Sequence, residues 1–278
     1  MLLGLHHVTA LAGDPQRNLD FYTRFAGMRL VKRTVNFDDP AGYHLYYSAG
    51  AGAPGTLLTF FPWVTGRRGV RGSGQITGVR MRVPKESLGG LPTDPDGIAI
   101  GFLESAAPPG LQSVTLCEAD AAPTAAFLRD VLGLKTIREE PQARRFEMPD
   151  GAWIDVLHSP GTPRGRMAAG MVHHVALRVA DEETQLEWRE RLIRAGLRVS
   201  PVKDRLYFHS IYFREPGGVL LEIATDGPGF LIDEAEDQLG QRLCLPPWLE
   251  PARESIEGRL APLSNQTAAK ALGDTDGR

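Results

Sequence analysis

Hydrophobic and polar positions alternate most clearly in the last third of the chain, between residues 172 and 226. Residues 172–179 have the period of a strand, and residues 181–195 have the period of an amphipathic helix that stops at Gly196. Three further strands are expected over 197–202, 206–213 and 218–223. The predicted order of this unit is therefore β-α-β-β-β.

The same unit recurs along the chain. A first copy has a strand over 3–11, a helix from Asp14 that stops at Gly27, and strands over 28–35, 43–48 and 56–61. A third copy has a strand over 113–116, a helix over 120–132 and a strand over 151–155, whereas residues 75–84 and 97–104 predict only two strands of a second copy. Such recurrence is typical of one supersecondary unit that is reused. We predict an α+β protein of four βαβββ modules, the second one abbreviated, in two halves.

Candidate boundaries lie where the pattern lapses. Residues 1–105 form the predicted N-terminal half, and a segment rich in Pro and Gly at 106–110 is a plausible linker. Residues 111–226 form the predicted C-terminal half. Residues 227–278 are expected to be a helical tail, with an acidic helix over 233–240 and a second helix over 250–260.

Composition narrows the class of protein. The chain has 278 residues, of which 42% are hydrophobic and 23% charged, as in a soluble globular protein. A formal net charge of -3 makes no electrostatic case for nucleic acid or for an anionic membrane. Two cysteines are too few for a disulfide framework, and we find no apolar run of membrane-spanning length and no signal peptide. We expect a cytoplasmic protein.

One face of the fourth module carries candidate metal ligands. Because strand side chains alternate, Val175, Leu177 and Val179 should share a face that packs on helix residues Leu186, Leu192 and Ile193. His174 then lies on the opposite, concave surface. Glu222 is expected to face the same hollow, and a carboxylate in such an apolar strand is costly to bury unless it is paired or bound to a metal.

The first module has His7 at the position that matches His174, and Thr59 where the fourth has Glu222. Two imidazoles and one carboxylate leave positions open on a six-coordinate ion, which favours Fe(II), with Mn(II) as the alternative, over a closed zinc site. The third module has Ser113 and Asp155 at these places and is expected to be scaffold.

Several other polar residues have both a structural and a functional interpretation. The adjacent His6 and His173 point away from the ligands and are either core residues or hydrogen-bond partners of the ligands. His44 and His158 are interpreted as structural. A polar and aromatic set in the fourth module could serve a phenolic substrate, although each member taken alone is as well explained as an ordinary strand or turn residue: Arg205, Tyr207, His209 and Tyr212.

These motifs resemble those of a known group. The segments GLHHVT at 4–9, VHHV at 172–175, SIYFREPGG at 210–218 and LEIAT at 221–225 are similar to the vicinal-oxygen-chelate superfamily, which contains glyoxalases, bleomycin resistance proteins and extradiol dioxygenases. Within that superfamily the chain most resembles ring-cleaving dioxygenases of the hydroquinone type. The similarity runs from about residue 3 to residue 260.

The resemblance implies a glyoxalase-type fold and Fe(II) ligands at His7, His174 and Glu222. It also implies roles near the metal or the substrate for five further residues: His6, Thr9, His173, Arg205 and Tyr212. The implied reaction is ring cleavage of a hydroquinone or related aromatic diol by O2, in a protein that could be a homo-oligomer. Two alternatives in the same superfamily are a non-catalytic binding or resistance protein and a metal-dependent isomerase or lyase of the glyoxalase kind.

Overall fold

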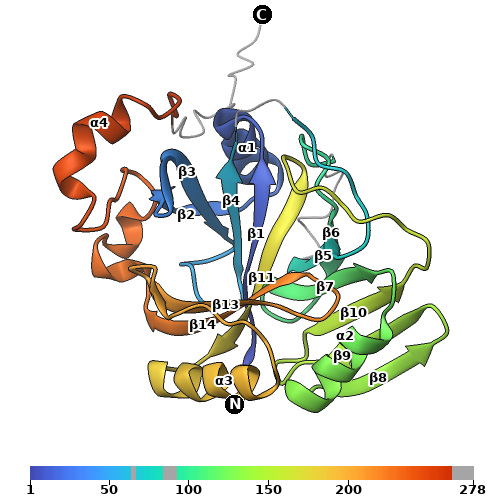
Figure 1. Cartoon of the computed structure of the whole chain (residues 1–278). Coiled ribbons are helices and arrows are strands. Elements are labelled where there is room, and N and C mark those ends of the chain that lie inside the picture. The colour runs from blue at the N-terminus through green and yellow to red at the C-terminus, as the bar shows by residue number, and fades with distance from the viewer. Residues whose placement is uncertain (64–66, 84–92, 265–278) are drawn as a thin grey trace, which may run out of the picture.

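The computed structural model describes residues 1–63, 67–83 and 93–264. Its strands lie in one mixed sheet, to which each module contributes a group (Figure 1). The elements of the first module are β1 (Gly4–Ala12), α1 (Pro15–Asp20), β2 (Arg29–Asn36), β3 (Asp39–Ser48) and β4 (Leu57–Pro62). Those of the second and third are β5 (Gln75–Val83), β6 (Ile100–Glu104), β7 (Gly110–Glu118), α2 (Ala122–Ala126), β8 (Lys135–Glu140), β9 (Ala143–Glu147) and β10 (Trp153–His158). Those of the fourth are β11 (Met171–Val179), α3 (Glu182–Arg194), β12 (Lys203–Asp204), β13 (Phe208–Arg214) and β14 (Leu220–Pro228).

The helices of the first and third modules share an unusual form. Both α1 and α2 continue directly into a π-helical segment, Phe21–Phe25 in one and Phe127–Val131 in the other. Asp14 begins the first helix by accepting a hydrogen bond from the backbone of Arg17 at 2.7 Å. This shared form supports the predicted repetition, and the α+β class is confirmed. The boundaries at 1–105, 111–226 and 227–278 stay predictions.

Strand pairing joins the first module to the fourth. β1 pairs with β11 antiparallel, with Val8 opposite Val175, and each of these strands has a parallel neighbour from its own module, β4 and β14 respectively. β5 and β7 join the second and third modules in the same antiparallel way. The hollow expected between the first and fourth modules is therefore formed by adjacent strands.

Two details of the fourth module differ from the prediction. Leu192 is buried as predicted, but Leu186 and Ile193 are 50% and 45% exposed, and α3 buries Gln185 and Trp188 in their place. Gln185 can lie inside because its amide donates to two strand carbonyls, each at 2.8 Å. The strand predicted over 197–202 is also wrong, since only an isolated bridge at Val199 forms there.

The tail packs along β2 (Figure 1). The acidic helix predicted over 233–240 is wrong, because only a short 3-10 turn forms there, at Glu236–Gln238, after a similar turn at Phe230–Ile232. The ammonium of Lys32, fully buried on β2, pairs with Asp233 at 2.6 Å and with Glu234. This buried charge holds the carboxylates of Asp233 and Glu234 together, in a conformation that differs from a regular helix. The second predicted helix is present as the shorter α4 (Arg253–Glu257).

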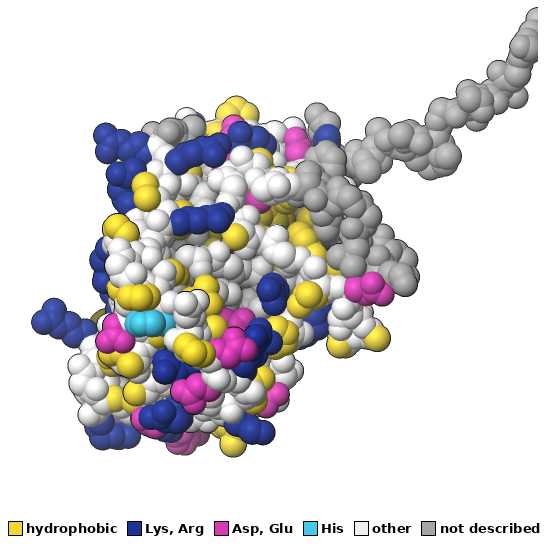
Figure 2. Space-filling view, turned by 90° about the vertical axis from the view of Figure 1, so that its right-hand side faces the viewer, with side chains coloured by type: hydrophobic (Ala, Val, Ile, Leu, Met, Phe, Trp, Pro, Cys, Tyr) yellow, Lys and Arg dark blue, Asp and Glu magenta, His cyan; other side chains and the backbone are white. Residues whose placement is uncertain are grey.

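The surface has mixed character. Figure 2 shows a face on which Lys and Arg side chains lie among acidic and apolar ones. Within the described residues, no helix has the length and apolar composition that a membrane crossing requires.

Candidate metal centre and substrate cavity

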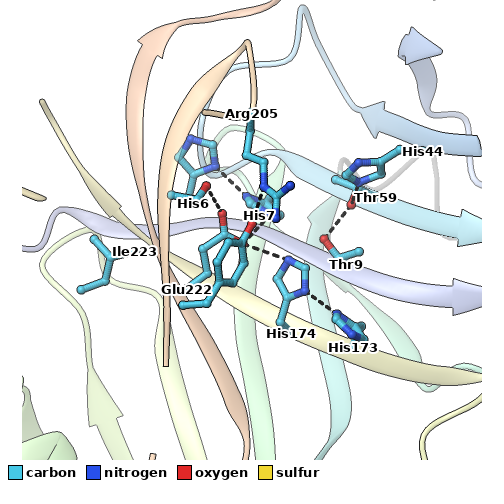
Figure 3. Close-up of polar contacts among 12 residues, drawn as sticks. His6, His7, Thr9, His44, Thr59, His173, His174, Arg205, Glu222 and Ile223 are labelled. Atoms are coloured by element: carbon cyan, nitrogen blue, oxygen red, sulfur yellow. Dashed lines mark hydrogen bonds and ion pairs between the residues drawn. The ribbon is translucent and has the colours of Figure 1, made fainter. Parts of the chain in front are cut away.

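Three adjacent strands bring His7, His174 and Glu222 together. The carboxylate Oε2 of Glu222 lies 2.9 Å from His174 Nε2 and 3.4 Å from His7 Nε2 (Figure 3). All three residues are buried, and their candidate ligand atoms lie within 4.8 Å of one another. His7 therefore lies in one compact group with His174 and Glu222, although more than half the chain separates it from them in sequence.

His6 determines which nitrogen of His7 is available. His6 Nε2 lies 3.1 Å from the Thr225 carbonyl, which can only accept, so this nitrogen carries the proton. Burial, and then the charge of His7, lowers the pKa of His6 to about 3, so the ring is neutral and its Nδ1 accepts. The donor to that atom is His7 Nδ1, at 2.9 Å. His7 Nε2 is thus left with a lone pair that points at the site.

The same contact recurs on the other side of the site. His173 Nδ1 lies 2.7 Å from His174 Nδ1, which gives His174 a partner for a proton on that nitrogen and leaves Nε2 for the site. Burial, followed by the charge of His174, lowers the pKa of His173 to about 3, so His173 is also neutral. Both histidines of ambiguous role in the sequence are therefore neighbours that orient candidate ligands.

Glu222 has the environment expected of a metal-binding carboxylate. Its Oε1 accepts from the Ser210 hydroxyl, whereas its buried Oε2 has no hydrogen-bond partner among the described residues. Burial alone would raise the pKa of Glu222, but His7 and His174 hold it well below its usual range. A proton on either imidazole, or a metal ion bound by all three side chains, can neutralise the carboxylate at this place. This donor set therefore fits a divalent metal ion.

A second group of potential ligands, Asp233, Glu234 and Cys244, lies in the tail. The ammonium of Lys32 already occupies its centre, within 2.6 Å of Asp233 and 3.8 Å of Cys244 Sγ. A buried cation that neutralises the carboxylates excludes a metal at this place. Among the described residues, the His7, His174 and Glu222 group is thus the one that could hold a metal.

Arg205 and Tyr212 lie together beside this site. Tyr212 is opposite Glu222 in the β13–β14 pair, and its hydroxyl accepts from Arg205 Nε at 3.1 Å. Arg205 also donates to Asp38 at 2.8 Å, which links the fourth module to the β2–β3 hairpin of the first. Burial, and then the negative charge of Glu222, raises the pKa of Tyr212 well above its usual range, so the phenol keeps its proton.

Three residues expected in the substrate pocket do not line the cavity. The fully buried Tyr207 donates to Asp233 in the tail at 2.9 Å. The His209 ring pairs with Glu182 on α3 at 3.1 Å, away from the candidate ligands. Thr9 is buried in the wall, where its hydroxyl bonds that of Thr59 at 2.7 Å.

His44, interpreted from the sequence as structural, lines the cavity. Its Nε2 lies 2.9 Å from the Thr59 hydroxyl (Figure 3). Its Nδ1 lies 2.8 Å from the Tyr46 hydroxyl, so the ring is held at both nitrogens. Burial, followed by the charge of His7, lowers its pKa well below the usual value. The available signal was strand alternation, which puts His44 and Tyr46 on one face of β3.

The cavity beside the candidate ligands has a volume of about 670 Å³ and is lined by the first and fourth modules. Its lining includes the buried His7 and His174, which mark its inner end, together with His173, Arg205 and Tyr212. The β2–β3 hairpin and Lys203 form one side of its mouth. The potential metal site thus opens into a space that admits a small molecule.

Comparisons with known proteins agree with this architecture. The model of the family "Glyoxalase/Bleomycin resistance protein/Dioxygenase superfamily" matches residues 4–72 and 110–223. The Bacillus subtilis (strain 168) protein "Putative ring-cleaving dioxygenase MhqO" is 39% identical, over 94% of this chain and 96% of its own. The "Chlorohydroquinone/hydroquinone 1,2-dioxygenase" of Sphingobium indicum is 30% identical, over 91% and 94%.

Solved structures show the same fold. A "putative dioxygenase" from Bacillus subtilis subsp. subtilis str. 168 superposes with a TM-score of 0.87 at 38% identity, covering 95% of this chain and 98% of that one. Glyoxalase I from Zea mays has a TM-score of 0.61 at 16% identity over 80% and 92%, a likeness of fold alone. The chain belongs to the glyoxalase/bleomycin resistance protein/dioxygenase superfamily.

Proposed function

We propose that this protein is an Fe(II)-dependent dioxygenase that cleaves the ring of a hydroquinone or a related aromatic diol with O2. The observation that carries the proposal is the buried Oε2 of Glu222, which lies 2.9 Å from His174 Nε2 and 3.4 Å from His7 Nε2 beside a cavity. A relative that matches 94% of this chain is named for ring cleavage, and one that matches 91% is named for hydroquinone.

The residues around the site suit this chemistry. His7, His174 and Glu222 would hold the ion, and bound Fe(II) would supply an electronic route between the diol and O2. Three protein ligands leave open positions for both reactants. Since both atoms of O2 enter the ring-opened product, the reaction needs no external reductant.

Arg205 and Tyr212 would act on the diol itself. A phenol that gives up its proton on binding leaves a negative oxygen, which donors placed beforehand stabilise in a dry site. Arg205 supplies the positive charge, and Tyr212 keeps its proton because its pKa is raised by burial and by Glu222. His173, neutral and exposed to the cavity, offers a further polar edge.

Anaerobic reconstitution with Fe(II), followed by measurement of O2 uptake, tests the proposal. Hydroquinone, methylhydroquinone and catechol should be compared, with Mn(II) and Zn(II) protein in parallel. We expect one O2 consumed per diol with Fe(II), none with Zn(II), and loss of uptake in Glu222→Gln. Absence of uptake with every diol would favour a binding protein of the same fold, and uptake with Mn(II) alone would reassign the metal.

The isomerase or lyase alternative would call for a fourth protein ligand. The position that matches Glu222 in the first module is Thr59, whose hydroxyl is held by both Thr9 and His44. A hydroxyl engaged in this way is a poor ligand, so we favour the open, three-ligand site. Cytoplasmic location and homo-oligomer formation stay predictions from the sequence.

A further inference from the structure

The cavity is much larger than a simple diol needs. Its volume is about 670 Å³, whereas a buried cavity of roughly 150 Å³ is enough to hold benzene. Unfilled space in an apolar cavity contributes nothing to binding, because the wall atoms there have no contact partners. A site that recognised only an unsubstituted ring would therefore leave most of this space without a role.

The cavity changes character along β1. His7 lies at its inner end and Leu11 lies four residues further along the same strand, a distance of about 13 Å at the usual rise of a strand. Leu11 is paired with Phe61 of β4, and the chain continues from Phe61 into Pro62 and Trp63, which also line the cavity. The outer end of this wall is therefore apolar.

Phe61 marks the boundary between the two parts. Its ring packs on that of His44 with centroids 4.2 Å apart and on that of His173 at 6.0 Å. On the inner side of this contact lie the polar groups that suit a diol. On the outer side lie Trp63 and Met167, which are 50% and 38% exposed although both are large apolar side chains.

Another part of the cavity lining is charged. Asp38, Asp39 and Lys203 line it, and Asp38 is engaged by Arg205 at 2.8 Å. Covering these charges with an apolar group would cost their solvation. A substituent on the ring would therefore extend toward Phe61, Trp63 and Met167.

From this arrangement we infer, on the basis of the proposed function, that the substrate is an aromatic diol with an apolar substituent about as large as a second ring. The diol lies at the His7 end, and the substituent contacts Leu11, Phe61, Trp63 and Met167. These four residues then determine specificity, and binding of the substituent covers the two exposed apolar side chains at the mouth.

Anaerobic calorimetry with hydroquinone and phenylhydroquinone tests this inference without turnover. Iron-loaded protein should bind phenylhydroquinone at least about tenfold more tightly, because one methylene in an apolar pocket already changes discrimination by roughly 10- to 200-fold. Trp63→Ala and Met167→Ala should each reduce this preference, because they should weaken binding of phenylhydroquinone more than binding of hydroquinone. Leu186→Ala, which truncates an exposed apolar residue on α3, is the matched control and should change neither Kd.

Equal affinity for the two diols would overturn the inference, as would variants at Trp63 and Met167 that weaken both diols alike. The same diols are then compared by O2 uptake. If phenylhydroquinone binds more tightly but neither diol causes O2 uptake, the proposed dioxygenase function is rejected and the pocket for the substituent is not. If hydroquinone causes O2 uptake but the two diols bind with equal affinity, the inferred substituent is rejected and the proposed dioxygenase function is not.

Discussion

The third and fourth modules have the same strand pairing and different chemistry. In β7 and β10, Asp155 pairs with Thr115, two residues after Ser113; in β11 and β14, Glu222 pairs with Ala176, two residues after His174. The two carboxylates therefore occupy equivalent places. What differs is the residue opposite each one on the next antiparallel strand: Arg145 faces Asp155, and Tyr212 faces Glu222.

This cross-strand neighbour decides whether the carboxylate is already paired. Arg145 holds both oxygens of Asp155, at 2.7 and 3.0 Å, and Trp153 donates to the same carboxylate at 3.1 Å. Tyr212 brings no charge, so Oε2 of Glu222 faces only the imidazoles of His7 and His174. A repeated fold thus provides the same carboxylate position twice, and the cross-strand neighbour makes one copy structural and the other a candidate ligand.

The largest expected effect is the loss of bound iron when a candidate ligand of the fourth module is replaced. Glu222→Gln and His174→Ala should each abolish retention of iron, since two protein ligands hold a labile divalent ion poorly. Asp155→Asn is the matched control at the equivalent position and should retain full iron. Metal analysis after anaerobic reconstitution and gel filtration measures this. Full occupancy in Glu222→Gln would reject Glu222 as a ligand.

Next in size is the effect of the cross-strand tyrosine. Tyr212→Phe keeps the shape of the ring but removes one donor, and we expect turnover of the diol to fall roughly 10- to 1000-fold with normal iron content. Steady-state O2 uptake across pH, together with metal analysis, measures both quantities. Turnover at the parent rate throughout would return Tyr212 to the role of an ordinary strand aromatic.

A smaller loss of metal affinity is expected in the first module, where His6 orients the candidate ligand His7. His6→Ala removes the acceptor that orients His7, so metal affinity should fall by roughly 10- to 100-fold, as for other outer hydrogen-bond partners of metal ligands. Competition with a chelator of known affinity measures the change. His6→Asn, whose amide oxygen can still accept from His7 Nδ1, should recover part of the loss. No recovery, with a native circular dichroism spectrum, would contradict the orienting role.

The smallest effect concerns the junction of the third and fourth modules, where Glu118 lies near Glu215. Burial, and then the charge of Glu215, raises the pKa of Glu118 to about 8. Because the folded pKa lies above the unfolded one, ionisation opposes folding: the cost begins as pH rises past the unfolded pKa and is complete above pH 8. An unpaired buried oxygen of this kind costs about 1–3 kcal/mol.

Glu118→Gln should therefore raise the free energy of unfolding at pH 9 and have little effect at pH 5. Urea unfolding at the two pH values measures the difference, and Glu187→Gln, at an exposed position on α3, is the control. A stabilisation of the same size at both pH values would show that ionisation of Glu118 is not its cause.

Local sequence patterns determined much of this protein. Alternation along strands placed His7, His174 and Glu222 on one hollow face, because side-chain direction in a strand depends only on position. Repetition of the βαβββ unit predicted that His7 and His174 are equivalent, and helix α3 begins and ends near the residues that the sequence indicated.

Other features depend on which segments meet in space. Tyr207 and Asp233 bond only because the tail packs on the first module, and that packing replaced the helix expected over 233–240. Gln185 is buried, and Leu186 exposed, because two strand carbonyls need a donor at that place. His44 reaches the cavity, and His6 fixes the tautomer of His7, through partners in other elements: Thr59 and Thr225. Sequence periodicity sets the direction of a side chain, but its hydrogen-bond partner comes from long-range packing, and only the tertiary structure decides that.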